Sequence, residues 1–346
     1  MGAAGTETAR AGGGGGAARR RAAARRRHRR GAPRRPPASA CASSAPASLG
    51  HATPPSIASS FASLRARGKR AAFIPFLTAG DGPRGLETTA ACIRVLCERG
   101  ADVIELGVPY ADPLADGPVI QAASARALYG NKTTLAGVLA MLRALRSGEH
   151  PEAAAGGGGA PLSLPPVVLF TYINPILKMG VPAFFEAVRE SGGSGVLVPD
   201  LPLEESAAFR AEAAARGLDL ILLATPTTPG ARMREIVRRS SGFTYLVSVT
   251  GVTGARRGVE ARLPELVRSL REASEEVAGE AGGAPLPVAV GFGVASAETA
   301  REVIGYGADG VIVGSALVRA IGEADSEEEG MRRFEEIVAE IAGACD

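Results

Sequence analysis

From residue 55 onward, short apolar runs alternate with longer stretches in which apolar residues recur at helical spacing. The apolar runs are continuous and do not alternate with polar residues, which is typical of parallel strands buried on both faces. Eight such runs lie near residues 72–77, 101–106, 167–172, 195–198, 218–223, 243–247, 287–290 and 310–313.

The stretches between the runs predict helices with recognisable ends. One helix is expected over 84–99 and stops at Gly100, because glycine is favoured just past a helix end. Near the C-terminus, Ser326 and Glu329 have capping-box spacing. Eight strand–helix repeats in about 290 residues predict an α/β fold, a (β/α)8 TIM barrel, with an extra helix over 57–67 before the first strand. A doubly wound sheet is the alternative.

Composition separates the first 54 residues from the rest. Residues 1–54 hold 11 arginines, no lysine and one acid, and they have almost no large apolar residues. Such a segment cannot bury a core, so a disordered extension is expected ahead of a single barrel domain over 55–346. A transit peptide is Arg- and Ser-rich and poor in acids, as this segment is. A nucleic-acid-binding arm and an inert extension or misassigned start are the alternatives.

The remaining 292 residues are acidic, with 28 basic and 35 acidic side chains, and they give no basic surface to continue a nucleic-acid contact. We therefore expect no nucleic-acid partner. Two flexible surface insertions are expected in this part, near 150–165, which contains four consecutive glycines, and near 276–286.

Several kinds of chemistry can be set aside. No run of 18 apolar residues is present, so no transmembrane helix is expected. The four cysteines lack metal-ligand or CxxC spacing and are expected to be reduced. The histidines are His28, His51 and His150, all in the N-terminal segment or an insertion, so the barrel offers none for a catalytic triad or a metal. Proton transfer is left to carboxylates, lysine, tyrosine or water.

The second apolar run contains one carboxylate, Glu105, and the loop after it carries Asp112 and Asp116. A charged group facing a core is costly, and in a barrel the catalytic groups sit at the C-terminal ends of strands. If Ile104 and Leu106 pack on helices, Glu105 points into the barrel mouth. Burial there would raise its pKa and suit it to act as an acid and a base.

The same three carboxylates are also compatible with purely structural roles. Glu105 is alternatively a structural residue that pairs with an arginine or caps backbone amides. Asp112 and Asp116 are alternatively turn formers beside Pro113 and Gly117. A metal held by all three carboxylates has no further support in the sequence.

Glycines after the last three apolar runs predict an anion site. They stand in residues 250–258, in Gly291–Gly293 and at Gly314, where Ser315 opens a helix. Glycine allows a ligand close to the backbone, and a helix N-terminus favours an anion. Phosphate sites after strands 7 and 8 recur in this fold, so a phosphate monoester is expected. Ordinary turns and helix starts are the alternative.

These motifs resemble those of the tryptophan synthase α subunit family, over about residues 57–343. The most specific parts are Pro75–Asp81 and Glu105–Gly117, and further matches are Val198–Pro202, Gly251–Gly254, Gly291–Gly293 and Gly314–Ser315.

The resemblance implies cleavage of indole-3-glycerol phosphate to indole and glyceraldehyde 3-phosphate. Glu105 matches the glutamate that protonates the indole ring carbon, and Asp116 matches the aspartate that accepts a hydrogen bond from the indole N–H. Asp112 is then left to organise the loop or to contact a lid. The remaining implied residues are Phe76, Tyr172 and Tyr245 for the indole pocket, Gly254, Gly293, Gly314 and Ser315 for the phosphate, and Thr253 for a mobile lid.

The resemblance also implies partners and location. A pyridoxal-phosphate β subunit is expected in an α2β2 complex, with no cofactor or metal in this chain. A stand-alone lyase that releases indole, a non-catalytic activator of the β subunit and another phosphate-binding barrel are the alternatives. The N-terminal arm and residues 250–254 resemble plant or algal plastid members, so a chloroplast location is expected, although composition alone leaves the mitochondrion open.

Overall fold

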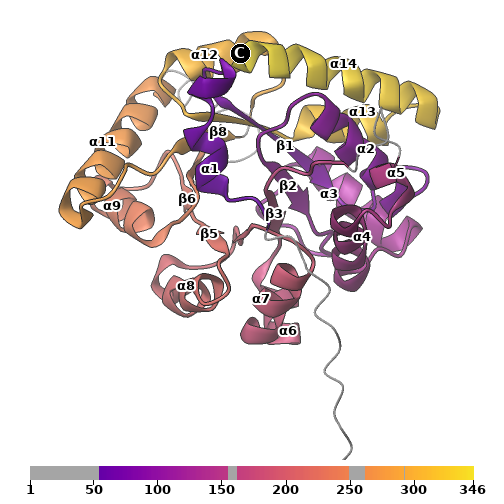
Figure 1. Ribbon diagram of the computed structural model, residues 1–346, viewed down its shortest axis with the longest axis horizontal. Helices are drawn as coiled ribbons and strands as arrows, with labels where there is room; N and C mark the ends of the chain where they lie inside the picture. Colours follow the sequence, from indigo (N-terminus) through magenta and orange to yellow (C-terminus); the bar gives the residue numbers. More distant parts are fainter. Residues whose placement is uncertain (1–53, 155–161, 249–261, 292) are drawn as a thin grey trace, which may run out of the picture. The chain divides into compact units, whose positions relative to one another are not determined.

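The strands form a single parallel sheet that curls into a barrel. The computed structural model describes residues 54–154, 162–248, 262–291 and 293–346. In these residues the strands are ordered β5-β4-β3-β2-β1-β9-β8-β7-β6, and every pairing is parallel (Figure 1). The strands are β1 (Ala72–Thr78), β2 (Ile104–Gly107), β3 (Val167–Phe170), β4 (Gly195–Leu197), β5 (Asp219–Ile221), β6 (Leu223–Ala224), β7 (Thr244–Val247), β8 (Val288–Gly291) and β9 (Gly310–Val313).

Each strand segment falls in one of the eight predicted runs, and the fifth run supplies both β5 and β6. These two segments are separated by Leu222 alone; β5 pairs with β4, and β6 pairs with β7. The two ends of the sheet are therefore adjacent in the chain, which nearly closes the barrel. The TIM-barrel prediction is confirmed, and the doubly wound alternative is excluded because the strand order never reverses from the middle of the sheet.

Helices follow the strands and cover the outside of the barrel (Figure 1). They are α1 (Ile57–Ala62), α2 (Leu86–Glu98), α3 (Pro118–Ala125), α4 (Leu135–Ser147), α5 (Pro151–Ala154), α6 (Ile173–Met179), α7 (Val181–Glu190), α8 (Ser206–Ala214), α9 (Gly230–Arg239), α11 (Leu263–Ala281), α12 (Ala297–Gly305), α13 (Ser315–Gly322) and α14 (Glu327–Cys345), with short turns η1 (Arg65–Arg67), η2 (Arg126–Gly130) and η3 (Leu203–Glu205). None of the helices in the described ranges is long and apolar enough to cross a membrane.

The predicted helix ends agree with the structure. The helix expected over 84–99 is α2, and Gly100 follows it with a φ of 78°, the left-handed conformation that glycine adopts freely. The Ser326 hydroxyl accepts a hydrogen bond from the Glu329 amide (3.2 Å) and caps α14. The extra N-terminal helix is α1, whose Ile57 is fully buried.

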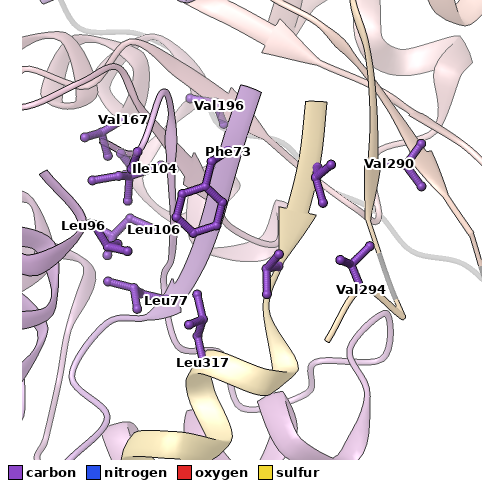
Figure 2. Close-up of a cluster of buried hydrophobic side chains, with 14 of the residues drawn as sticks. Phe73, Leu77, Leu96, Ile104, Leu106, Val167, Val196, Val290, Val294 and Leu317 are labelled. Atoms are coloured by element: carbon purple, nitrogen blue, oxygen red, sulfur yellow. The ribbon is translucent and has the colours of Figure 1, made fainter. Parts of the chain in front are cut away.

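Two apolar layers hold the barrel together. The outer layer lies between sheet and helices, and Figure 2 shows Ile104 and Leu106 of β2 in it beside Leu96 of α2. The inner layer fills the barrel, and it includes Val103, which precedes β2. Side chains alternate along a strand, so Glu105 is directed inward with Val103, as predicted.

Four strands begin with the same pair of hydrogen bonds, which we call reciprocal clasps. In each clasp, an amide in the first two residues of a strand donates to the side chain of an Asp or Ser that stands one to three residues before a later strand, which is β2, β4, β7 or β9. The bonds run from Phe73 N to Asp102 Oδ2 (2.8 Å), from Val167 N to Ser194 Oγ (3.3 Å), from Leu220 N to Ser241 Oγ (2.9 Å) and from Val288 N to Asp309 Oδ2 (3.0 Å). The amide of the same Asp or Ser donates back to the carbonyl of the strand residue.

The two stretches expected to be surface insertions contain more regular structure than the sequence indicated. Residues 276–281 form the end of α11, and their glycine-rich continuation is exposed. Within 150–165, Pro151–Ala154 form α5 and residues 155–161 lie outside the described ranges. His150 is buried; its Nδ1 accepts a hydrogen bond from the Glu152 amide (3.2 Å), and its Nε2 lies 3.5 Å from Glu87 Oε2.

Candidate active site

Glu105 is the second residue of β2 and faces the interior of the barrel. In the sheet register it stands beside Phe76 of β1 and Val168 of β3, and only 1% of its surface is exposed. Its Oε1 has no hydrogen-bond partner, and no ion pair of Glu105 occurs within the described residues, so the arginine-paired alternative has no support. Burial raises the pKa of Glu105 to about 8, because the anion would lose its hydration. At pH 7 the group is therefore mainly a neutral carboxylic acid.

Phe76 links this acid to the start of α13. A Cβ added to Gly107 would lie 2.5 Å from Phe76 Cζ, and one added to Gly314 would lie 3.5 Å from Phe76 Cδ1. The ring therefore lies between the end of β2 and the first turn of α13. It also meets the Phe170 ring edge to face, with centroids 5.4 Å apart. The Gly107 position has no room for a side chain while Phe76 keeps this place.

Asp116 is held by Tyr172. The Tyr172 hydroxyl donates to Asp116 Oδ2 (2.9 Å) and accepts from the Ala115 amide (3.1 Å). Burial raises the pKa of Asp116 to about 6, and the bond from Tyr172 opposes that rise. At pH 7 Asp116 is mainly ionised and Glu105 mainly protonated, so the two carboxyl groups of one mouth carry different charges.

Tyr245 closes another side of the mouth. A Cβ added to Gly291 of β8 would lie 2.1 Å from Tyr245 Oη, so the phenol rests directly on that glycine. Burial, followed by the negative charges of Glu105 and Asp116, raises the pKa of Tyr245 well above its ordinary value. Tyr245 is therefore a neutral phenol near both carboxyl groups.

The structure describes only some of the residues that were expected to bind the phosphate. Gly314 is half-buried beside Phe76, and Ser315 is the exposed first residue of α13. The amides of a first helical turn lack partners within the helix and favour an anion. Gly293 has a φ of 99°, which other residues rarely adopt. Thr253 and Gly254 lie outside the described residues.

The three carboxylates of the 105–117 stretch are not equivalent. Asp112 is exposed on the loop, whereas Asp116 turns toward Tyr172. In the described ranges no group of three His, Cys, Asp or Glu side chains could hold a metal ion. The structure thus gives no support to a metal held by Glu105, Asp112 and Asp116 together.

The structure adds two residues that the sequence did not single out. The Tyr110 ring stacks on Tyr172 with centroids 4.8 Å apart, and the Tyr110 hydroxyl accepts a hydrogen bond from Asn174 Nδ2 (2.8 Å). Tyr110 stands inside the 105–117 stretch, where an aromatic residue between the carboxylates was a usable signal. A helical stretch was expected after the third run, but nothing in its pattern distinguished Asn174 from the other polar residues of that stretch.

The fold and the site define a TIM-barrel enzyme in which a neutral acid and an ionised carboxylate share one aromatic-lined mouth. The family model described as "Tryptophan synthase alpha chain" matches residues 61–345. The chain belongs to the tryptophan synthase alpha chain family.

Individual relatives agree with this assignment. The chain is 46% identical over 290 residues to the tryptophan synthase alpha chain of Synechococcus elongatus, covering 84% of this chain and 97% of the relative. It is 44% identical over 279 residues to that of Arabidopsis thaliana, covering 81% and 91%. It is also similar to a chain in the structure of Mycobacterium tuberculosis tryptophan synthase (TM-score 0.68, 34% identity, covering 84% and 98%). A chain of the Pyrococcus furiosus tryptophan synthase complex gives a TM-score of 0.64 at 34% identity, covering 80% and 99%.

Proposed function

We propose that this chain is a carbon–carbon lyase that cleaves indole-3-glycerol phosphate to indole and glyceraldehyde 3-phosphate for tryptophan biosynthesis. The observation that carries the proposal is the contrast between Glu105 and Asp116: one is buried and neutral at pH 7, and the other is ionised in the same mouth. Membership of the tryptophan synthase alpha chain family supplies the substrate class. The chemistry needs only proton transfer and hydrogen bonding, and pyridoxal phosphate belongs to the β subunit.

Glu105 handles both protons of the reaction. Its carboxyl group donates a proton to C3 of the indole ring, the carbon that carries the glycerol phosphate chain. The bond between C3 and that chain then breaks, and its electron pair returns to the ring. The hydroxyl on the departing carbon becomes the aldehyde as its proton passes to the Glu105 carboxylate, which restores the acid. A pKa near 8 suits a group that must give and take a proton near neutral pH.

Asp116 stabilises the charge that this sequence creates. Protonation at C3 places positive charge on the ring nitrogen, and an ionised carboxylate that accepts the N–H hydrogen bond lowers the energy of that state. The bond from Tyr172 leaves the other oxygen, Oδ1, to face a ligand. Phe76, Tyr172 and Tyr245 supply the apolar walls that an indole ring requires.

The phosphate of the substrate binds at the start of α13. The first-turn amides at Ser315, with the open backbone at Gly314 and Gly293, form a cradle for a dianion. Gly314 lies against Phe76, and Phe76 stands beside Glu105. The Phe76 ring therefore separates the bound phosphate from the Glu105 carboxyl group. Gly254 and Thr253, which the family resemblance assigns to the phosphate site and to a lid, lie outside the described residues.

A β subunit binds beside the mouth in an α2β2 complex. Leu114, on the loop after β2, is 82% exposed, and Leu177 of α6 is 55% exposed. The bond from the Ala115 amide to Tyr172, which directly precedes α6, brings the two segments together. Large apolar side chains exposed on adjacent segments are typical of an interaction surface. The chain reaches its partner in the chloroplast, with residues 1–54 serving as the transit peptide.

The test measures indole formed from indole-3-glycerol phosphate by the full-length chain, with and without a tryptophan synthase β subunit. Glu105→Gln should lower the rate at least about 100-fold, because it removes the proton donor and keeps the shape. Asp116→Asn should also be strongly impaired, whereas Glu302→Gln, which alters an exposed glutamate of α12, should not be. Absence of indole in every case would refute the lyase assignment. Fast turnover without the β subunit would identify a stand-alone lyase.

A further inference from the structure

Two side chains anchor the loop that carries Asp116. Gln121 of α3 holds its backbone, because its Nε2 donates to the carbonyls of Asp116 (2.8 Å) and Pro113 (3.5 Å), and Tyr172 holds the Asp116 carboxylate. Leu114 and Ala115 are exposed, so the loop has little packing of its own at this point. Tyr172 fixes it twice, through the Ala115 amide (3.1 Å) and through Asp116 Oδ2 (2.9 Å). Gln121 contacts only the backbone of Asp116, so the place of the Tyr172 ring decides how the Asp116 carboxylate is oriented.

Two other aromatic rings fix the place of Tyr172. Phe170 meets it edge to face, with ring centroids 6.5 Å apart, from inside the barrel. Tyr110 stacks on it with centroids 4.8 Å apart and an angle of 23° between the planes. Tyr110 is only half-buried, but its hydroxyl accepts a hydrogen bond from Asn174 Nδ2 (2.8 Å) near the start of α6. That bond restrains the outer ring of the stack from turning into solvent.

We propose that Tyr110, restrained by Asn174, is a positioning residue that holds Tyr172 against Asp116 and so fixes Asp116 for the reaction. The assignment rests on the proposed function, because it concerns the carboxylate that receives the indole N–H. Tyr110 and Asp116 belong to the same loop, so the stack closes a ring of contacts from β2 through the loop and Tyr172 back to the loop. Such a ring holds a carboxylate in one orientation before the substrate arrives.

The proposal predicts a particular split between kinetic constants. Asp116 acts mainly on charge that develops during the reaction, so a misplaced Asp116 lowers kcat more than it raises KM. Aromatic pairs of this kind are worth enough to change a rate about 2- to 10-fold. Tyr110→Leu should lower kcat by up to about tenfold with little change in KM. Tyr110→Phe keeps the stack, loses only the Asn174 bond, and should lower kcat about two- to threefold.

The experiment is a pair of double-mutant cycles on the full-length chain with its β subunit. In the first, Tyr110→Phe and Asn174→Ala each remove one side of the same hydrogen bond, so the double variant should be no slower than the worse single variant. In the second, Tyr110→Leu should cost little further activity in an Asp116→Asn background. Tyr129→Leu, a change at an exposed tyrosine of η2, is the matched control and should leave kcat and KM unchanged.

A measurement without substrate separates the stack from the chemistry. The chain has five tyrosines and no tryptophan, so its near-ultraviolet circular dichroism reports chiefly on tyrosines. Tyr110→Leu should reduce this signal strongly, whereas Tyr110→Phe should largely preserve the Tyr172 contribution.

The outcomes are distinguishable. Additive losses in either cycle, or an unchanged spectrum in Tyr110→Leu, overturn the positioning role and leave the lyase assignment intact. A wild-type chain with no lyase activity overturns the lyase assignment and this role of Tyr110 with it.

Discussion

Replacing Glu105 by glutamine should stabilise the protein while it lowers the rate of indole formation at least about 100-fold. Glutamine has the shape of the neutral acid and cannot ionise. In the folded protein burial raises the pKa of Glu105 from 4.5 to about 8. Between these pH values the unfolded chain has lost its proton at this residue while the folded chain keeps it. The wild-type protein therefore loses stability as the pH rises through this window, and the variant is spared that loss.

The size of the effect follows from the width of the window. Each pH unit between the two pKa values corresponds to about 1.4 kcal/mol. From pH 5 to pH 7 the free energy of unfolding of Glu105→Gln, relative to wild type, should therefore rise by about 3 kcal/mol. The gain should stop growing above about pH 8, where the folded wild-type protein also ionises.

The assay is urea unfolding followed by far-ultraviolet circular dichroism at pH 5, 6, 7 and 8. Glu302→Gln is the control, and its stability should follow that of wild type across the series, because this glutamate is exposed. If the difference between Glu105→Gln and wild type is the same at every pH, Glu105 does not stay protonated in the folded protein. The acid assigned to the lyase reaction would then lose its physical basis.

Three further changes probe the supports of the site. Arg126→Leu removes the two hydrogen bonds (2.7 and 2.8 Å) that pair the Asp81 carboxylate, which is 5% exposed, and should cost about 3 kcal/mol in urea unfolding. Adding Asp81→Asn should recover part of that cost, and no recovery would contradict the pairing argument. Gly291→Ala places a methyl group 2.1 Å from Tyr245 Oη, so indole formation should fall at least about tenfold with far-ultraviolet dichroism unchanged; full activity would show that the ring can move freely. Ser326→Ala removes the cap of α14 and should lower the free energy of unfolding by about 1 kcal/mol, and an unchanged value would make the cap dispensable.

The barrel was predictable because its strands are continuous apolar runs and because helix ends carry typical residues, such as Gly100 after α2 and Ser326 before α14. The direction of Glu105 was predictable for the same reason, since its apolar neighbours Ile104 and Leu106 had to face the helices. The interruption of the fifth strand at Leu222 was not predictable, because the fifth run is as apolar at this residue as elsewhere. The burial of His150 was also missed, because the glycines that follow it suggested a loose insertion.

The candidate site, too, was predictable from the sequence only in part. The residues alone gave no reason to rank Asp116 above Asp112, since both stand in a proline-rich loop; the family resemblance ranked them, and the contact with Tyr172 now gives the physical difference. The Tyr110–Asn174 bond joins a loop to a helix 64 residues further along the chain. No local pattern encodes such a pair, because loop conformation decides which side chains meet.

The four reciprocal clasps have a consequence for how the barrel moves. They all lie at the N-terminal ends of strands, whereas the loop that carries Asp116 follows the C-terminal end of β2. Parting two clasped strands at that end breaks two hydrogen bonds at once, one in each direction. We therefore expect thermal opening of the barrel to begin at the C-terminal ends of the strands. The four clasps restrain separation of the strands at their N-terminal ends, and no such pair of bonds is described at their C-terminal ends.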